Sequence, residues 1–89
     1  MDKTTPMEIL ATDFSQDFIE LMRHRVVHGF AKWGSVRQYK DKRADGRPAT
    51  ADSYREDVNR LLDTYTESKD PKLLADAANY LMFLYMRNA

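Results

Sequence analysis

The residues best suited to chemistry in this chain of 89 residues are cations and aromatic rings gathered in one segment, residues 29–49. Six of the fourteen Lys and Arg residues lie there beside two carboxylates, so the segment carries a net charge of +4. It also contains the only Trp and one of the five Tyr. Arginine presents a planar fork to phosphate oxygens, and an aromatic ring presents a flat face to a base. The segment predicts a site for an anionic, nucleotide-like small molecule. The competing interpretation is an exposed loop that is basic but binds nothing.

The predicted ligand-binding residues combine this segment with polar and aromatic positions further along the chain. The cations would bind phosphate, and Trp33, Tyr39 or Tyr54 would stack on a base. Asp76 and Asn79 are three residues apart on one face of a predicted helix and would orient the cations or contact polar groups of the ligand. The complete set is Lys32, Trp33, Arg37, Tyr39, Lys40, Arg43, Arg47, Tyr54, Asp76 and Asn79.

Asp76 and Asn79 also have a purely structural interpretation. A carboxylate in an apolar helix is costly unless it is paired. The alternative is therefore a salt bridge from Asp76 to an arginine of another helix, with Asn79 bonded to backbone.

Other constellations carry weaker signals. His24 and His28 have the spacing of a helical metal-binding pair, but no third ligand follows, and the neighbouring arginines disfavour a cation. Residues 54–57 open the second predicted helix, where free N–H groups favour an anion, yet Glu56 and Asp57 already satisfy the helix dipole. The chain has no Cys nucleophile, no P-loop and no dinucleotide-binding glycine motif.

Three helices are predicted to position these residues, which makes the fold class all-α. The first covers residues 12–28, with Thr12 or Asp13 as its N-cap and Gly29 just after its end. The second begins within residues 50–53, where Ser53 and Glu56 have capping-box spacing, and its apolar pattern ends within residues 66–69. No alternation typical of a strand persists for more than a few residues.

The third predicted helix has the clearest signals, because Asp70 suits an N-cap and Pro71 suits the first helical position. From Leu73 to Met86 it is apolar on almost every side, so it must be covered on almost every side. Two other short helices cannot do this alone. We therefore expect a homo-oligomer.

The predicted organisation is a single domain over residues 1–89, with a long basic connector at 29–49 and a short helical turn near residues 36–40. Residues 1–11 are predicted to form a flexible arm, whose Met7, Ile9 and Leu10 could dock on a neighbour. The neutral total charge disfavours nucleic acid as a partner. No membrane span, secretory signal or Cys is present, and we expect a cytoplasmic protein without membrane contact.

The stretch LLADAANYLMFLYM resembles the D-x-A-N-Y/F helix of MazG-like, all-α nucleoside triphosphate pyrophosphohydrolases, especially small phage-encoded ones. KWGSVRQYKD and YREDVNRLLDTY are similar to short actinobacterial and phage proteins of the same kind. The resemblance covers about residues 20–86, and its most specific part is about ten residues long. It implies an all-α fold and two acidic motifs, ExxE and ExxD, that hold Mg²⁺ against a triphosphate.

The acidic motifs of that family are depleted in this chain. Asp76 matches the last position of ExxD, but Leu73 stands where the Glu should be. Glu56 matches one Glu of ExxE, whereas Ser53 and Asn59 occupy the positions three residues away on either side. Mg²⁺ needs several oxygen ligands, so the resemblance implies a nucleotide-binding bundle that has lost its metal chemistry.

Three functions follow from the sequence. The first is non-catalytic binding of a phosphorylated nucleotide-like ligand with no cofactor; in a phage protein this would sequester a nucleotide messenger of host defence in the host cytoplasm. The alternative is a divergent, Mg²⁺-dependent MazG-like pyrophosphohydrolase that uses Glu56, Asp57 and Asp76. The third is an interaction module whose basic loop binds an acidic protein or nucleic acid.

Overall fold

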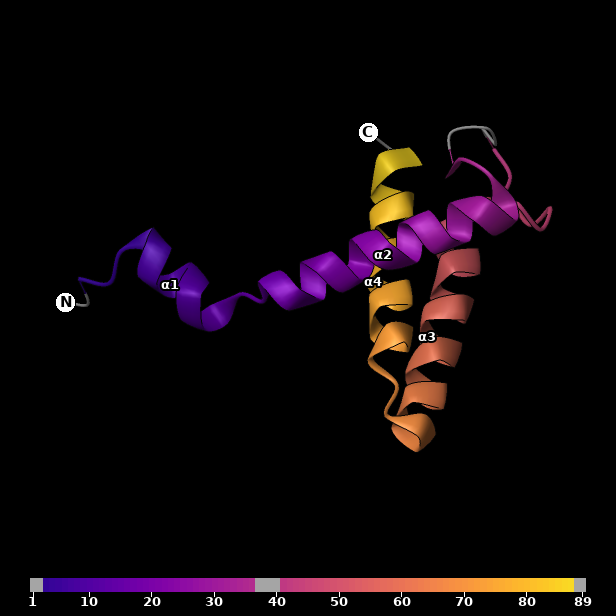
Figure 1. Ribbon diagram of the computed structural model, residues 1–89. Coiled ribbons are helices and arrows are strands. Elements are labelled where there is room, and N and C mark those ends of the chain that lie inside the picture. Colours follow the sequence, from indigo (N-terminus) through magenta and orange to yellow (C-terminus); the bar gives the residue numbers. More distant parts are fainter. Residues whose placement is uncertain (1–2, 37–40, 88–89) are drawn as a thin grey trace.

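The computed structural model describes residues 3–36 and 41–87, and in these residues the chain forms four helices and no strand (Figure 1). They are α1 (Pro6–Asp13), α2 (Gln16–Trp33), α3 (Ala51–Ser68) and α4 (Pro71–Arg87). The all-α prediction is confirmed. The number of helices is four and not three, because residues 6–11 of the predicted flexible arm belong to α1.

The first two helices begin at hydroxyl caps. Thr5 precedes α1, and its side chain accepts a hydrogen bond from the backbone N–H of Glu8. Ser15 precedes α2 and accepts from Phe18 N in the same way, at 3.0 Å. Both hydroxyls satisfy backbone N–H groups that have no partner within the helix. The prediction that Thr12 or Asp13 begins the longer helix was wrong, because α1 includes both residues and Ser15 is the cap.

The end of α2 also differs from its prediction. Gly29 does not end the helix, which continues to Trp33 and ends at Gly34. A glycine inside a helix costs only about 1 kcal/mol, so it need not terminate one. Gly34 adopts φ 78° and ψ −168°, a conformation that is accessible almost only to glycine. The residue that supplies the positive φ therefore ends α2.

Helices α3 and α4 begin where the sequence predicts. Thr50 caps α3, whereas Ser53 lies buried in its first turn and donates its hydroxyl hydrogen to Pro48 O at 2.6 Å. The prediction that Ser53 and Glu56 form a capping box is therefore wrong, because the N-cap is Thr50, three residues earlier. Asp70 Oδ1 accepts a hydrogen bond from Lys72 N at 3.0 Å, and Pro71 is the first residue of α4, as predicted.

Helices α3 and α4 form a hairpin, and α2 crosses α4 (Figure 1). The buried apolar residues lie on α3 and α4 and are Tyr54, Leu61, Ala75 and Ala77. Ala75 and Ala77 have small side chains, which allow the backbones of neighbouring helices to approach closely. This buried apolar core is small, and ion pairs also link the elements.

Helix α1 extends away from the hairpin at the far end of α2 (Figure 1). None of its residues is buried, and Met7, Ile9 and Leu10 are exposed. The radius of gyration is 15.4 Å, compared with about 12 Å expected for a compact domain of this length. Leu81 and Tyr85 of α4 are exposed as well, so the apolar surface that suggested an oligomer remains uncovered in the single chain.

The connector between α2 and α3 is organised at its C-terminal part. Lys42 and Pro48 form an isolated antiparallel bridge, and Arg43 N donates to Arg47 O at 2.8 Å. Gly46 takes φ 91° in the turn between them. This tight turn fixes the two arginines beside α3. The short helical turn predicted near residues 36–40 falls almost wholly outside the described residues. In the described part of the chain no helix is long and apolar enough to cross a membrane.

Candidate ligand-binding site

A crevice of about 570 Å³ lies between α2, α3, α4 and the connector. This volume falls within the range of roughly 300–1,000 Å³ that is typical of small-molecule sites. Six Lys and Arg residues and three Asp residues line it, which gives the lining a net charge of +3. The cations are Arg25, Lys32, Arg43, Arg47, Arg60 and Arg87, and the carboxylates are Asp45, Asp57 and Asp76. The crevice therefore keeps the positive character that the sequence predicted for this region.

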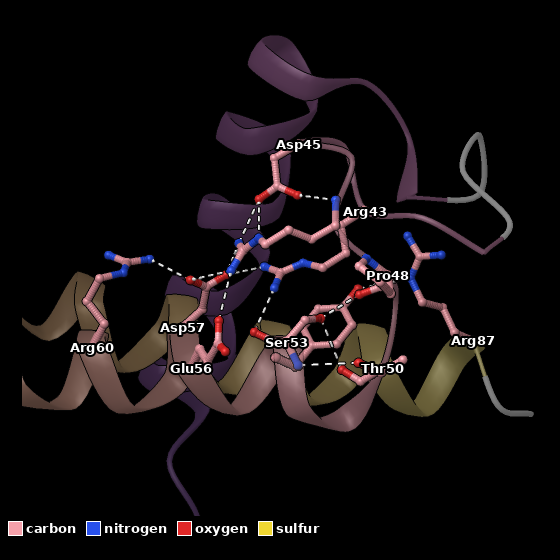
Figure 2. A network of polar contacts seen from close by, with 11 residues as sticks. Arg43, Asp45, Pro48, Thr50, Ser53, Glu56, Asp57, Arg60 and Arg87 are labelled. Atoms are coloured by element: carbon pink, nitrogen blue, oxygen red, sulfur yellow. Dashed lines mark hydrogen bonds and ion pairs between the residues drawn. The ribbon is translucent and has the colours of Figure 1, made fainter.

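Three arginines surround Asp57 on α3, and we call Arg43, Arg47, Arg60 and Asp57 the Asp57 cluster (Figure 2). Arg43 and Arg47 both donate to Oδ2, the latter at 2.7 Å. Arg60 Nη2 donates to Oδ1 at 3.1 Å. Burial raises the pKa of Asp57, but the hydrogen bonds from the three arginines outweigh it and lower that pKa to about 2. The carboxylate is therefore charged at every physiological pH.

Arg43 is the most deeply held cation of the cluster. Its side chain is 7% exposed, and Nη1 donates to the Ser53 carbonyl oxygen at 2.9 Å. Its guanidinium also lies 4.3 Å from the ring centroid of Tyr54 and 5.1 Å from that of Tyr80. These contacts attach the connector to α3 and α4. A phosphate would have to compete with them, so Arg43 is better suited to holding the site together than to gripping a ligand.

Arg47 and Arg60 are more accessible. Arg47 is 38% exposed and shares its donors between Asp45 and Asp57, with Nε bonded to Asp45 Oδ2 at 2.8 Å. Hydrogen bonds with these two carboxylates raise the pKa of Arg47, and the bonds from Arg47 lower the pKa of Asp45. Arg60 is 62% exposed and uses Nη2 for Asp57. Its other guanidinium nitrogens make no hydrogen bond to a described residue.

Asp76 and Asn79 join α4 to α2, which confirms the structural interpretation of this pair. Arg25 Nε donates to Asp76 Oδ1 at 2.9 Å, and Nη2 donates to Oδ2 at 3.1 Å. The hydrogen bond and charge of Asp76 raise the pKa of Arg25. Asn79 Nδ2 donates to Met22 O at 2.9 Å. Both residues nevertheless line the crevice.

The aromatic residues of the predicted site differ in accessibility. Tyr54 is 3% exposed, Arg43 covers its ring, and its hydroxyl accepts from Arg87 Nε at 2.9 Å, so a base cannot stack on it. Trp33 is 50% exposed and lines the crevice, with Lys32 Nζ 5.1 Å from its ring centroid. Phe30, which the sequence did not single out, is 60% exposed on the same wall. The more exposed rings of the crevice lining are thus at the C-terminal end of α2.

The remaining predicted site residues, Arg37, Tyr39 and Lys40, lie outside the described residues. The sequence analysis did not identify Arg25 and Arg60 as residues of the site. Arg60 had a usable signal, because it stands three residues after Asp57 on one helix face. Arg25 had none, since its partner Asp76 is 51 positions away.

The carboxylates do not fit a Mg²⁺ site. Asp57 and Asp76 each use both oxygens for arginine, and the side chain of Glu56 is 74% exposed. Within residues 3–36 and 41–87, no group of three or more His, Cys, Asp or Glu residues could hold a metal ion, and His24 and His28 are exposed. We therefore derive no metal-dependent step from this arrangement.

Comparisons with protein-family models, with curated proteins and with solved structures found no match for this chain. The resemblance to MazG-like pyrophosphohydrolases therefore stays a prediction. Fold and site define the molecule as a small all-α protein with a positively charged crevice that is lined in part by aromatic rings.

Proposed function

We propose that this protein binds a small phosphorylated, nucleotide-like ligand in the crevice without turning it over. The observation that carries the proposal is the lining, where six cations face three carboxylates and exposed rings stand on one wall. Phosphate groups favour such an excess of positive charge, and a base favours an exposed aromatic ring.

Phosphate would bind at the Asp57 cluster. Arg47 and Arg60 are partly exposed, and the three arginines face two carboxylates of the crevice lining, Asp57 and Asp45, while Glu56 outside the lining lies 3.8 Å from Arg47. Asp57 holds the guanidinium groups in place before a ligand arrives. This preorganisation lowers the entropy that binding would otherwise cost.

The base would bind on the aromatic lining of the crevice, which includes Phe30 and Trp33 of α2 and Tyr80 and Phe83 of α4. Stacking of a base on an aromatic side chain contributes about 1–3 kcal/mol. Lys32 lies over the Trp33 ring and adds positive charge to the crevice. The ligand class that suits both the cations and the rings is an anion with an attached planar ring.

Binding can be tested by thermal shift and calorimetry with linear and cyclic nucleotides. A ligand that binds only the folded state must raise the melting temperature. Arg60→Gln should weaken binding about tenfold, because it removes a charge-assisted contact. Arg55→Gln is a matched control, since Arg55 has the same i,i+3 carboxylate pairing on α3 and lies outside the crevice lining. If no nucleotide at millimolar concentration shifts the melting temperature, the proposal fails.

The same samples separate the alternatives. Product analysis after incubation with nucleoside triphosphates and Mg²⁺ tests the pyrophosphohydrolase, and turnover would replace our proposal with that activity. If no nucleotide binds but Arg47→Glu abolishes binding to a macromolecule, the chain is an interaction module. Native mass spectrometry of protein purified from cells would show both the oligomeric state and any bound nucleotide. Sequestration of a messenger by a phage protein rests on the resemblance alone.

A further inference from the structure

One buried polar atom in the crevice wall lacks a hydrogen bond. Asn79 is 4% exposed and lines the crevice, and no described residue donates to its Oδ1. Its Nδ2 faces the carbonyl oxygen of Met22 at 2.9 Å. Because a carbonyl oxygen can only accept, the amide must present nitrogen to Met22 and oxygen to the other side. A buried acceptor without a partner is costly, which points to a donor that this chain does not supply.

The surroundings of Asn79 limit the kind of donor. Asp76 stands one turn earlier on the same face of α4, and its two-point ion pair with Arg25 leaves no net charge there to attract a phosphate. Tyr80 and Phe83 line the wall beside it, with their ring centroids 6.3 Å apart. A planar ring that carries an N–H group suits these neighbours better than an ionised phosphate, which has no hydrogen to donate.

We infer that Asn79 Oδ1 accepts a hydrogen bond from an exocyclic amino group on the base of the ligand, an inference that rests on the proposed function. Asn79 is then a specificity-determining residue, and the ligand class narrows to amino-substituted nucleotides. The oxygen is screened from bulk water by its neighbours.

The experiment uses two matched pairs of ligands that differ by one amino group. They are adenosine and purine riboside 5′-monophosphates, and cytidine and pyrimidin-2-one riboside 5′-monophosphates. We expect calorimetry to show about tenfold tighter binding of the amino form in at least one pair, the effect of one neutral hydrogen bond to a buried acceptor. Asn79→Leu should remove this difference, whereas Asn59→Leu, an exposed position of α3 outside the crevice lining, should retain it.

The outcomes distinguish the two proposals. If both members of each pair bind equally to the wild-type protein, the inference about Asn79 is overturned and nucleotide binding stands. If none of the four ligands binds, both are overturned for these nucleotides. The wild-type comparison remains decisive even if Asn79→Leu does not fold. A tenfold loss with 2′-deoxyadenosine monophosphate but not with purine riboside monophosphate would assign the contact to a sugar hydroxyl and overturn the inference.

Discussion

Replacement of Asp57 by Asn should destabilise the fold strongly, because the buried carboxylate holds three arginines from two elements. The substitution keeps the shape of the side chain but removes the charge, and Arg43, whose side chain is only 7% exposed, loses its ionic partner. Burial of an unpaired charge is among the few mechanisms that produce large losses of stability. The perturbation therefore isolates the electrostatic contribution of the Asp57 cluster.

The magnitude follows from the pKa of Asp57, which falls from 3.8 to about 2 in the folded protein. At about 1.4 kcal/mol for each pH unit, the charged carboxylate stabilises the fold by about 2–3 kcal/mol. For a domain of this size such a loss lowers the melting temperature by roughly 10–20 °C. Urea unfolding followed by circular dichroism measures the free energy directly.

The pH dependence provides a second readout of the same prediction. A carboxyl group with a lowered pKa contributes its full stability well above the unfolded value of 3.8 and loses it as the pH falls toward 2. Wild-type protein should therefore lose about 2 kcal/mol more than Asp57→Asn between pH 5 and pH 2, as converted by the same constant.

Asp52→Asn is the matched control, because Asp52 also pairs with an arginine three residues later but is 84% exposed. Its effect on the free energy of unfolding should stay below about 0.5 kcal/mol. If Asp57→Asn unfolds within that margin of the wild type and shows the same pH dependence, the reasoning about the cluster is refuted.

Three further predictions concern the frame and the walls of the crevice. Arg25→Gln should lower the free energy of unfolding by about 1–3 kcal/mol in urea, since it leaves the part-buried Asp76 unpaired; an unchanged midpoint would contradict this. Gly34→Ala should cost about 1–3 kcal/mol because of its positive φ, whereas Gly29→Ala, with open space at its Cβ, should stabilise helix α2; calorimetric melting of both variants shows whether the signs are opposite. Trp33→Leu should weaken nucleotide binding about tenfold by calorimetry with little change in melting temperature, and unchanged affinity would remove the ring from the site.

Much of the helical framework was predictable because its signals are local. Pro71 and Asp70 start α4 through contacts within one turn, and the apolar period of α3 runs until its pattern stops. The errors fell where two local signals competed. Gly29 and Gly34 both suit a helix end, and Asp13 and Ser15 both suit a cap. Periodicity cannot choose between such pairs.

The candidate site was predictable in composition but not in its pairings. The sequence placed a positive, aromatic segment beside Asp76 and Asn79, and the crevice is lined by residues from all three. It could not show that Arg43 finds Asp57, or that Arg25 finds Asp76 from 51 positions away. Each arginine has several carboxylates at comparable sequence distance, and nothing local distinguishes them.

The sequence by itself therefore determined the helices, the excess of positive charge in one connector and the presence of polar groups on an apolar helix. Those properties depend on capping, periodicity and composition, which act over a few residues. Only the tertiary structure decided which cations pair with carboxylates inside the fold and which remain exposed. It buried Arg43 and Tyr54 as structural contacts, left Arg60 and Trp33 accessible, and left Asn79 Oδ1 without a donor, because the crossing of α2 over α4 brings together residues that the chain keeps far apart.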